Sequence, residues 1–201
     1  MTYRNNELMQ PLAWGHSAER RAFLRCGLGA LAVGMAPRLW AAAAAAPAQP
    51  GTVRIEMFNA AGASTGVLSV AKVVHTEAEW KARLPELSYY VTREQGTERA
   101  YTGAYASNHD DGLYRCICCD TALYDSRTKF ESGTGWPSFF RPISALNIVK
   151  TSDTSFGWQR DAISCRRCDA HLGHVFDDGP PPTGLRYCMN SVALRFVPRS
   201  K

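Results

Sequence analysis

Short runs in which apolar and polar residues alternate dominate the second half of the chain. Glycine, proline and aspartate separate these runs at intervals of about eight to twelve residues, a spacing typical of strands in a small sandwich or barrel. The runs cover residues 122–126, 147–153, 157–164, 174–178 and 191–197. The pattern therefore predicts a mainly β domain.

One helix is predicted ahead of these strands, in the sequence HTEAEWKARLPEL at residues 75–87. Thr76, with Glu79 three positions later, has the signature of a capping box, in which each side chain accepts a hydrogen bond from the other residue's backbone N–H. Pro85 is expected to end this helix, because proline cannot continue the intrahelical hydrogen-bond ladder.

Two other segments have the composition of linkers and loops. Residues 49–75 are rich in glycine, alanine and serine with a few β-branched residues, so we predict a linker or loose N-terminal arm. Residues 177–184, DDGPPPTG, are predicted to form a rigid loop, because consecutive prolines cannot form a central strand. The folded domain is then expected to span residues 76–199.

The first 48 residues resemble an export signal. Arg20 and Arg21 are followed by Phe-Leu, a weakly apolar run and an alanine-rich exit, which is typical of a twin-arginine signal peptide. Glu19 departs from that class, which usually shows serine or threonine there. An uncleaved anchor or a linker fits less well, because Pro37 and Arg38 interrupt the apolar run. We expect cleavage near Ala48 and a periplasmic mature protein.

Charge and hydropathy bear on the classes of partner. The net charge is +5, but residues 1–48 hold five arginines against two glutamates, so only +2 remains for the rest, without a basic block. Nucleic-acid binding needs a concentrated basic stripe, so it is not expected. No run reaches roughly 18 uncharged apolar residues, so stable membrane association is not expected either.

Two Cys-x-x-Cys pairs predict a structural zinc site. Cys116 with Cys119, and Cys165 with Cys168, have the spacing of zinc knuckles, whose tight turns direct two thiolates at one ion. Four thiolates complete a tetrahedral shell with no open position, so the predicted Zn²⁺ is structural and not catalytic. The long interval between the pairs implies that zinc joins two distant parts of the domain.

Two other interpretations of these pairs remain open at this point. The four cysteines of an exported protein can form two disulfides, although a Cys-x-x-Cys disulfide closes a very short loop and stabilises little. A thioredoxin-like redox pair needs a βαβ context, which the pattern lacks. Zinc is favoured over both, and Cys118, inside the first knuckle, is left as a spare thiol.

Cys188 stands apart from these pairs, among residues suited to thiol chemistry. A lone cysteine is by default a small buried apolar residue. Arg186, His171 and His174 are candidates to lower the pKa of the Cys188 thiol, because a nearby cation or donor favours the thiolate. Trp136, on a loop rich in glycine and proline, suits a binding wall. The residues predict a Cys/His thiol enzyme on a zinc-braced β scaffold.

Two other functions fit parts of the same pattern. A zinc-braced module that only binds a partner would keep Cys188 buried, so rapid alkylation of that thiol would argue against it. A Cys-His hydrolase would need an oxyanion hole and an acyl substrate.

Four segments of the chain resemble, in order, the motifs of the peptide-methionine (R)-S-oxide reductases, the MsrB family. They read VTREQGTERAYTGAY, GLYRCICCDTALYDSRTKFESGTGWPSF, CRRCDAHLGHVFDDGP and PTGLRYCMNSVALRF. The resemblance covers roughly residues 77–197. It implies a small β fold of two antiparallel sheets with a short N-terminal helix, and a Cys₄ zinc site away from the active site.

The resemblance also implies roles for single residues. Cys188 matches the nucleophile that attacks the sulfoxide sulfur and becomes a sulfenic acid. His174 is then expected to protonate the leaving oxygen, which His171 and Asn190 hold. The remaining predicted contacts with substrate are an apolar cradle for the S-methyl group and a neighbouring cation. They are Trp136, Phe139, Phe176 and Arg186.

Thr134 departs from the commonest pattern of the family. Many members have a second cysteine in this loop, which resolves the sulfenic acid into a disulfide. Here either Cys118 or an external thiol reductant must regenerate Cys188, and external reduction is favoured because Cys118 lies in a zinc knuckle. The implied partners are oxidised proteins or peptides that carry methionine R-sulfoxide, together with a thioredoxin-like or other thiol reductant.

Overall fold

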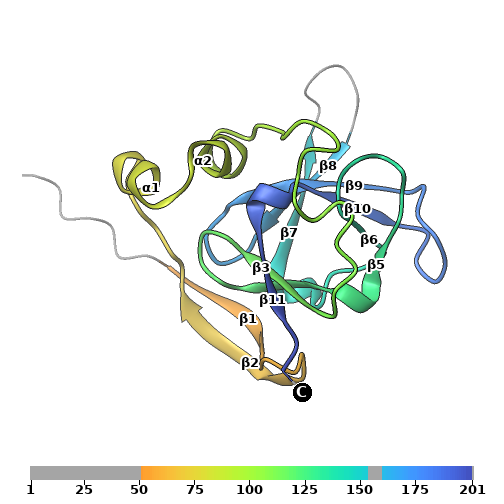
Figure 1. Cartoon of the computed structure of the whole chain (residues 1–201). Coiled ribbons are helices and arrows are strands. Elements are labelled where there is room, and N and C mark those ends of the chain that lie inside the picture. The colour runs from red at the N-terminus through yellow and green to blue at the C-terminus, as the bar shows by residue number, and fades with distance from the viewer. Residues whose placement is uncertain (1–50, 154–159, 201) are drawn as a thin grey trace, which may run out of the picture. The chain divides into compact units, whose positions relative to one another are not determined.

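The computed structural model describes residues 51–153 and 160–200, so the predicted signal at residues 1–48 lies outside the described residues. Within these ranges the chain forms two α-helices and eleven strands, and every strand pairing is antiparallel (Figure 1). The prediction of a mainly β fold is confirmed. Neither helix of the described ranges has the length and apolar character needed to cross a membrane.

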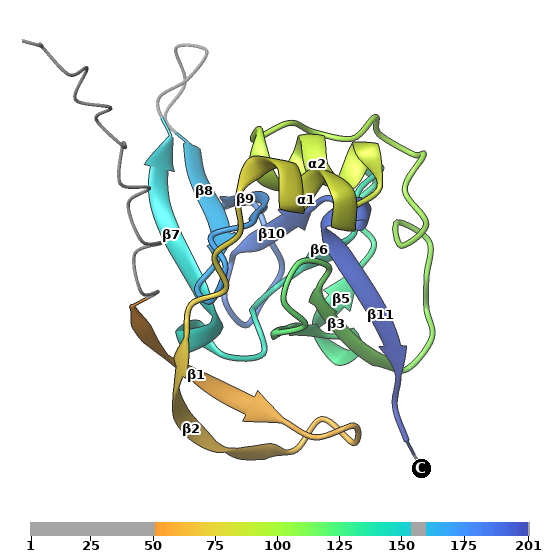
Figure 2. The ribbon, with the colours of Figure 1, turned by 90° about the vertical axis from the view of Figure 1, so that its left-hand side faces the viewer.

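The predicted helix is present as α1 (Glu77–Arg83), and its capping box is complete. The Thr76 hydroxyl accepts from the N–H of Glu79 at 3.3 Å, and the Glu79 carboxylate accepts from the N–H of Thr76 at 2.8 Å. Pro85 ends this helix as predicted, but it also serves as the N-cap of a second helix, α2 (Glu86–Arg93). The two helices lie side by side over one end of the domain (Figure 2).

The larger sheet has six strands, and Cys188 lies on one of its inner strands. In order across the sheet they are β5 (Lys129–Phe130), β6 (Ser138–Phe139), β10 (Arg186–Met189), β9 (His171–Phe176), β8 (Arg160–Cys165) and β7 (Ile148–Asp153). Because β10 lies between β6 and β9, its backbone takes part in two hydrogen-bonded ladders.

A three-stranded sheet packs against the larger one through aromatic side chains. Its strands, in order, are β11 (Leu194–Pro198), β3 (Gly112–Cys116) and β4 (Ala122–Asp125). Tyr124 stacks on Phe139 with ring centroids 4.4 Å apart, and Tyr114 meets Phe139 edge to face at 5.0 Å. All three rings are fully buried, so they form the centre of the core between the two sheets.

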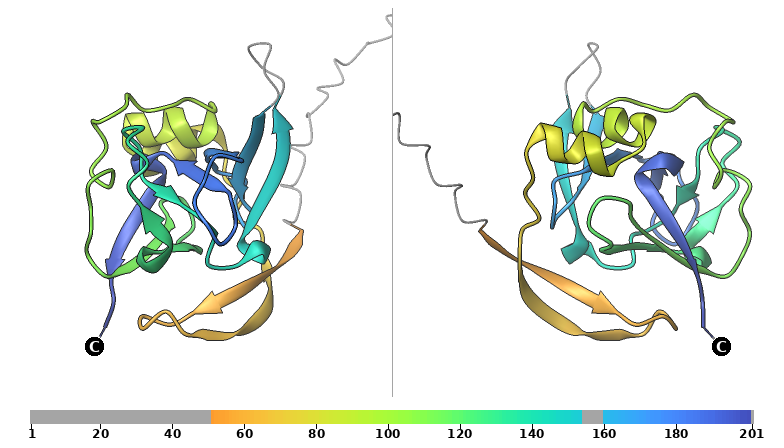
Figure 3. Two further views of the ribbon diagram at one scale, coloured as in Figure 1. Left: turned by 90° about the vertical axis from the view of Figure 1, so that its right-hand side faces the viewer. Right: turned by 60° about the vertical axis from the view of Figure 1, so that its left-hand side comes forward.

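The described part of the predicted linker or arm, residues 51–75, is not loose. β1 (Thr52–Phe58) and β2 (Ser64–Ala71) form a hairpin, a third sheet beyond the two expected. The buried Asn147 fixes it: its Oδ1 accepts from the N–H of Glu56 at 2.8 Å, and its Nδ2 donates to the Glu56 carbonyl at 2.9 Å. The hairpin lies at the end of the domain opposite the helices (Figures 2 and 3).

Candidate active site and metal centre

Each Cys-x-x-Cys pair lies at the turn of a β-hairpin. Cys116 ends β3 and Cys165 ends β8, and each is followed by a tight turn into the next strand. The aspartate after the second cysteine has a positive φ, 62° at Asp120 and 56° at Asp169, and its N–H donates to the carbonyl of the first cysteine at 2.9 Å. Aspartate tolerates this left-handed conformation. The repeated sequence Cys-x-x-Cys-Asp therefore builds the same knuckle twice.

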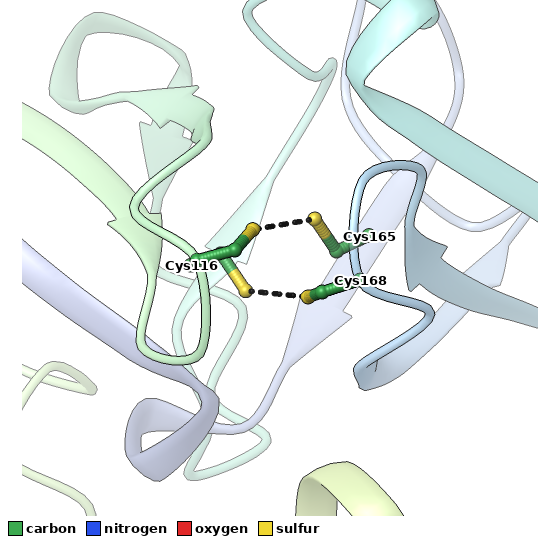
Figure 4. Close-up of side chains that lie close together, drawn as sticks. Cys116, Cys165 and Cys168 are labelled. Carbon is green, nitrogen blue, oxygen red and sulfur yellow. Dashed lines mark hydrogen bonds between the residues drawn. The ribbon is translucent and has the colours of Figure 1, made fainter. Parts of the chain in front are cut away.

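The two knuckles face each other and bring four thiols together. The sulfur of Cys116 lies 3.6 Å from that of Cys168, and the sulfur of Cys119 lies 3.5 Å from that of Cys165 (Figure 4). All four sulfur atoms lie within 4.8 Å of one another. A tetrahedral zinc ion with Zn–S bonds of about 2.3 Å separates its thiolates by about 3.8 Å. The four cysteines therefore fit one structural Zn²⁺, as predicted.

None of the six described cysteines forms a disulfide, so the structure does not support the alternative of two bridges. Cys118 is half-buried beside the metal cluster, and its thiol contacts Cys116, Cys168 and Thr92. These neighbours belong to the zinc knuckles and to α2. The spare thiol is thus part of the metal end of the domain.

Cys188 occupies the third position of β10, paired on both sides. Its register partners are Ser138 on β6 and His174 on β9. Gly173, with φ 154°, lets β9 approach closely, because a methyl group at that position would lie 2.1 Å from the carbonyl oxygen of Cys188. The sheet itself therefore holds the histidine beside the cysteine.

A pocket of about 170 Å³ opens over this strand pair. Five of the predicted site residues meet in it, together with three that were not predicted. The lining is Cys188, His174, Asn190, Trp136 and Phe176, with Thr97, Gly173 and Met189. A larger groove of about 730 Å³ lies along the two helices and contains none of these residues, so the smaller pocket is the candidate active site.

Burial is the main influence on the Cys188 thiol, and it raises the pKa. The hydroxyl of Thr134, the guanidinium of Arg186 and the hydroxyl of Ser138 act in the opposite direction and offset only part of this effect. Of the residues expected to lower the pKa of Cys188, Arg186 acts in that direction, but burial outweighs the combined effect of the three contacts. The resting side chain is therefore a thiol at neutral pH.

A chain of hydroxyl groups lies beside the Cys188 sulfur. Thr134 Oγ1 is 3.9 Å from Cys188 Sγ and 2.8 Å from the hydroxyl of Ser132, which in turn is 2.8 Å from the hydroxyl of Ser138. Position 134 is therefore in contact with the candidate nucleophile. The threonine occupies the place from which a second cysteine would reach Cys188.

Arg186 lies behind the pocket instead of lining it. Its Nε and one terminal nitrogen donate to the two carboxylate oxygens of Asp178 at 2.9 and 2.8 Å, and its guanidinium stacks on Phe176 at 4.4 Å from the ring centroid. Its predicted contact with substrate stays a prediction. The residue supports Phe176 and places positive charge near Cys188.

Two further predicted residues also lie outside the pocket lining. Phe139 is fully buried in the aromatic core, because the two-residue strand β6 turns Ser138 toward Cys188 and Phe139 to the opposite face. Its predicted contact with a substrate methyl group is wrong. His171 is buried on β9, with its ring edge-on to His174 at 5.2 Å, so it packs behind the histidine of the pocket.

Glu98 is a site residue that the sequence analysis missed. Its carboxylate, 1% exposed, accepts from the N–H groups of Ser191 and Val192 at 2.6 and 3.0 Å. Its own N–H donates to the amide oxygen of Asn190 at 2.9 Å, and its carbonyl accepts from the indole of Trp136 at 3.1 Å. One buried residue thus fixes two walls of the pocket. Its partners are distant in sequence, so no local pattern marks it.

The amide of Asn190 is largely engaged by the protein. Besides accepting from Glu98, it donates from Nδ2 to the carbonyl of Leu172 at 3.1 Å. A carboxamide has two N–H donors, so one N–H remains for a bound oxygen.

The model of the SelR domain matches residues 84–198. The chain is similar to proteins named "Peptide methionine sulfoxide reductase MsrB". It is 57% identical over 128 residues to the one from Pseudomonas putida (strain W619), covering 64% of this chain and 96% of that protein. It is 54% identical over 129 residues to the one from Pseudomonas syringae pv. syringae (strain B728a), covering 64% of this chain and 98% of that protein.

Proposed function

Since the chain belongs to the SelR family of peptide methionine sulfoxide reductases, the MsrB family, we propose that Cys188 is its nucleophile and that the pocket above β10 is the sulfoxide site. The enzyme reduces the R epimer of methionine sulfoxide to methionine. The observation that carries the residue assignment is the convergence of Cys188, His174, Asn190 and Trp136 on one pocket.

In the proposed reaction, the oxygen of the sulfoxide is transferred from the substrate sulfur to the sulfur of Cys188. The Cys188 sulfur attacks the sulfur of the sulfoxide, its thiol proton is released, and the sulfoxide oxygen becomes protonated. The attack forms a bond between the two sulfur atoms. That bond breaks as the oxygen transfers from the substrate sulfur to Cys188, which becomes a sulfenic acid, and the thioether leaves. Methionine sulfoxide is thereby reduced by two electrons to methionine and the cysteine is oxidised by two, without further reactants in this half of the cycle.

His174 is the candidate proton donor to the sulfoxide oxygen. It lines the pocket and lies directly opposite Cys188 in the ladder between β9 and β10. A histidine can give and take protons near neutral pH. His171, packed edge-on against it, orients the ring, and the remaining N–H of Asn190 is available to the same oxygen.

Trp136 and Phe176 supply the apolar part of the pocket. The indole is held by its hydrogen bond to the carbonyl of Glu98, and the phenyl ring is held by the guanidinium of Arg186. Two fixed rings beside one oxygen-binding group distinguish the methyl group from the oxygen of a sulfoxide. This arrangement supports selection of one epimer.

The zinc site acts at a distance from this chemistry. Zn²⁺ bound by Cys116, Cys119, Cys165 and Cys168 supplies a structural crosslink with no open coordination position. The residues join the hairpin of β3 and β4 to the hairpin of β8 and β9. Because β9 carries His174, the metal stabilises the strand that positions the candidate proton donor.

An external thiol is proposed to reduce the sulfenic acid of Cys188. Thr134 occupies the neighbouring position and its hydroxyl cannot form a disulfide. Cys118 contacts the zinc cysteines and α2 instead. A thioredoxin-like protein or another thiol reductant fits this requirement, and oxidised proteins or peptides are the other partners.

Export by the twin-arginine route to the periplasm is also proposed, on the sequence of residues 1–48 alone. Fusing these residues to a reporter that is active only after folded export would test it. Replacing Arg20 and Arg21 together with lysine should abolish export, and unchanged export would argue against the proposal.

The catalytic proposal is tested with the zinc-loaded full chain, dithiothreitol and the separate R and S epimers of a peptide methionine sulfoxide. We expect consumption of the R epimer only, loss of activity in Cys188→Ser, and retained activity in the matched variant Cys118→Ser. Consumption of the S epimer alone, or an active Cys188→Ser variant, would overturn it.

A further inference from the structure

Tyr101 is the most exposed large apolar residue of the described ranges, with 74% of its surface accessible. Its backbone has φ 65°, a left-handed conformation that is strained for an aromatic residue. An exposed aromatic ring held in a strained conformation needs structural support, and its neighbours supply it.

The loop that carries Trp136 provides this support. The N–H of Tyr101 donates to the carbonyl of Gly135 at 2.8 Å, and its hydroxyl donates to the carbonyl of Gly133. The ring lies against Gly135, where an added methyl group would come within 2.8 Å of a ring carbon. Tyr101 is thus fixed across the glycine loop without being buried by it.

The space beside Tyr101 adjoins the candidate sulfoxide site. A small hollow of about 50 Å³ is lined by Tyr101, Gly133, Gly135 and Trp136, with the polar residues Ser107 and Glu131 among the remaining lining. Trp136 also lines the pocket of Cys188, so one indole borders both spaces. At Gly133 an added methyl group would meet nothing within 4 Å, which leaves room for another backbone to approach.

We propose that this hollow is a subsite for the residue next to the methionine sulfoxide in a peptide, and that it prefers an apolar or aromatic side chain. The proposal rests on the assignment of the Cys188 pocket as the sulfoxide site. Neighbouring residues of an extended peptide are about 3.3–3.6 Å apart along the chain. A sulfoxide held against Trp136 therefore places its neighbour at the adjoining hollow, where the Tyr101 ring offers an apolar surface that its hydrogen bonds to Gly133 and Gly135 hold in position.

The test compares two substrates in the zinc-loaded full chain. One is a tripeptide with methionine R-sulfoxide between two phenylalanines, and the other is N-acetyl-methionine R-sulfoxide N-methylamide, which has no flanking side chain. An aromatic contact contributes about 1.5 kcal/mol, which corresponds to about a tenfold change in affinity. In Tyr101→Ala, the ratio of kcat/KM for the tripeptide to that for the amide should fall about tenfold, mainly through KM.

Two further variants make the outcome specific. Tyr101→Phe keeps the ring and should retain most of the ratio, whereas Tyr90→Ala removes an exposed tyrosine of α2 and should leave the ratio unchanged. An unchanged ratio in Tyr101→Ala, or an equal fall for both substrates, would overturn the subsite. A wild-type protein that reduces neither substrate would instead overturn the catalytic proposal.

Discussion

Removing the carboxylate of Glu98 should weaken both the fold and the substrate pocket. The carboxylate accepts two backbone N–H groups, from Ser191 and Val192, in an environment that leaves 1% of the residue exposed. Each hydrogen bond to a charged group contributes about 1.5–3 kcal/mol net, so two contribute about 3–6 kcal/mol. Glu98→Ala should therefore lose about 4 kcal/mol of unfolding free energy, a large part of the about 5–15 kcal/mol of a typical domain.

Glu98→Gln distinguishes the effect of losing the negative charge from the effect of losing the volume of the side chain. Glu98→Gln keeps the size of the side chain and one carbonyl acceptor, but its amide nitrogen cannot accept from the second N–H. We expect it to lose about 2 kcal/mol, roughly half the effect of alanine. Both variants should also raise KM for a sulfoxide peptide. The carboxylate anchors the backbone of Glu98, and this backbone in turn holds the side chains of Asn190 and Trp136.

Urea unfolding of the zinc-loaded full chain, followed by far-UV circular dichroism, measures the first effect, and steady-state kinetics measure the second. Asn147→Ala is the matched control, since Asn147 is equally buried but ties the hairpin of β1 and β2 to β4. It should lose stability without a change in KM. If Glu98→Ala lost less than about 1 kcal/mol, or if the control raised KM as much, the reasoning would be refuted.

Three further outcomes follow from the site and the metal centre. In Thr134→Cys, where the replaced hydroxyl lies 3.9 Å from the Cys188 sulfur, one turnover without reductant should give an intramolecular disulfide. Dimedone should label the sulfenic acid of the wild type, and labelling of this variant as well would contradict the prediction. In Arg186→Met, loss of a cation that lowers the pKa of Cys188 should move the midpoint of its pH-dependent alkylation by iodoacetamide to higher pH; an unchanged or lower midpoint would exclude that role. In Cys119→Ser, native mass spectrometry should show loss of the single zinc ion, and the melting temperature should fall because the two knuckles are no longer joined; retention of one zinc ion per chain with an unchanged melting temperature would contradict the assignment.

Local sequence signals predicted the parts of the fold that depend on neighbouring residues. The capping box of Thr76 and Glu79 and the two knuckles involve contacts within a few positions along the chain, and the strand runs show in the local alternation of apolar and polar residues. Helix α2 was missed because Pro85 indicated an end, and the following Tyr-Tyr-Val-Thr favours a strand. Tertiary packing, which buries Tyr89 and Val91, determines its helical state.

Features that depend on distant partners could not be predicted in this way. The hairpin at residues 52–71 is held by Asn147, which lies 91 positions from Glu56. Glu98 reaches Ser191 across 93 positions, so neither spacing nor composition indicates its role. The side-chain directions of Ser138 and Phe139 also required the pairing of β6 with β10, because a two-residue strand is too short to show an alternating pattern.

The position of Cys188 in an inner strand has a consequence for how the specificity of such an enzyme can diverge. Its backbone is hydrogen-bonded to a strand on each side. Trp136 lies on a loop that lines the pocket, and Tyr101 lies on a loop that lines the adjoining hollow. Mutations that accumulate in those loops alter which peptides are accepted while the reactive sulfur keeps its place. The fold therefore separates the strand that holds the reactive sulfur from the loops at the entrance, and a library randomised at Tyr101, with Trp136 kept, should preserve turnover while exploring new sequence preferences.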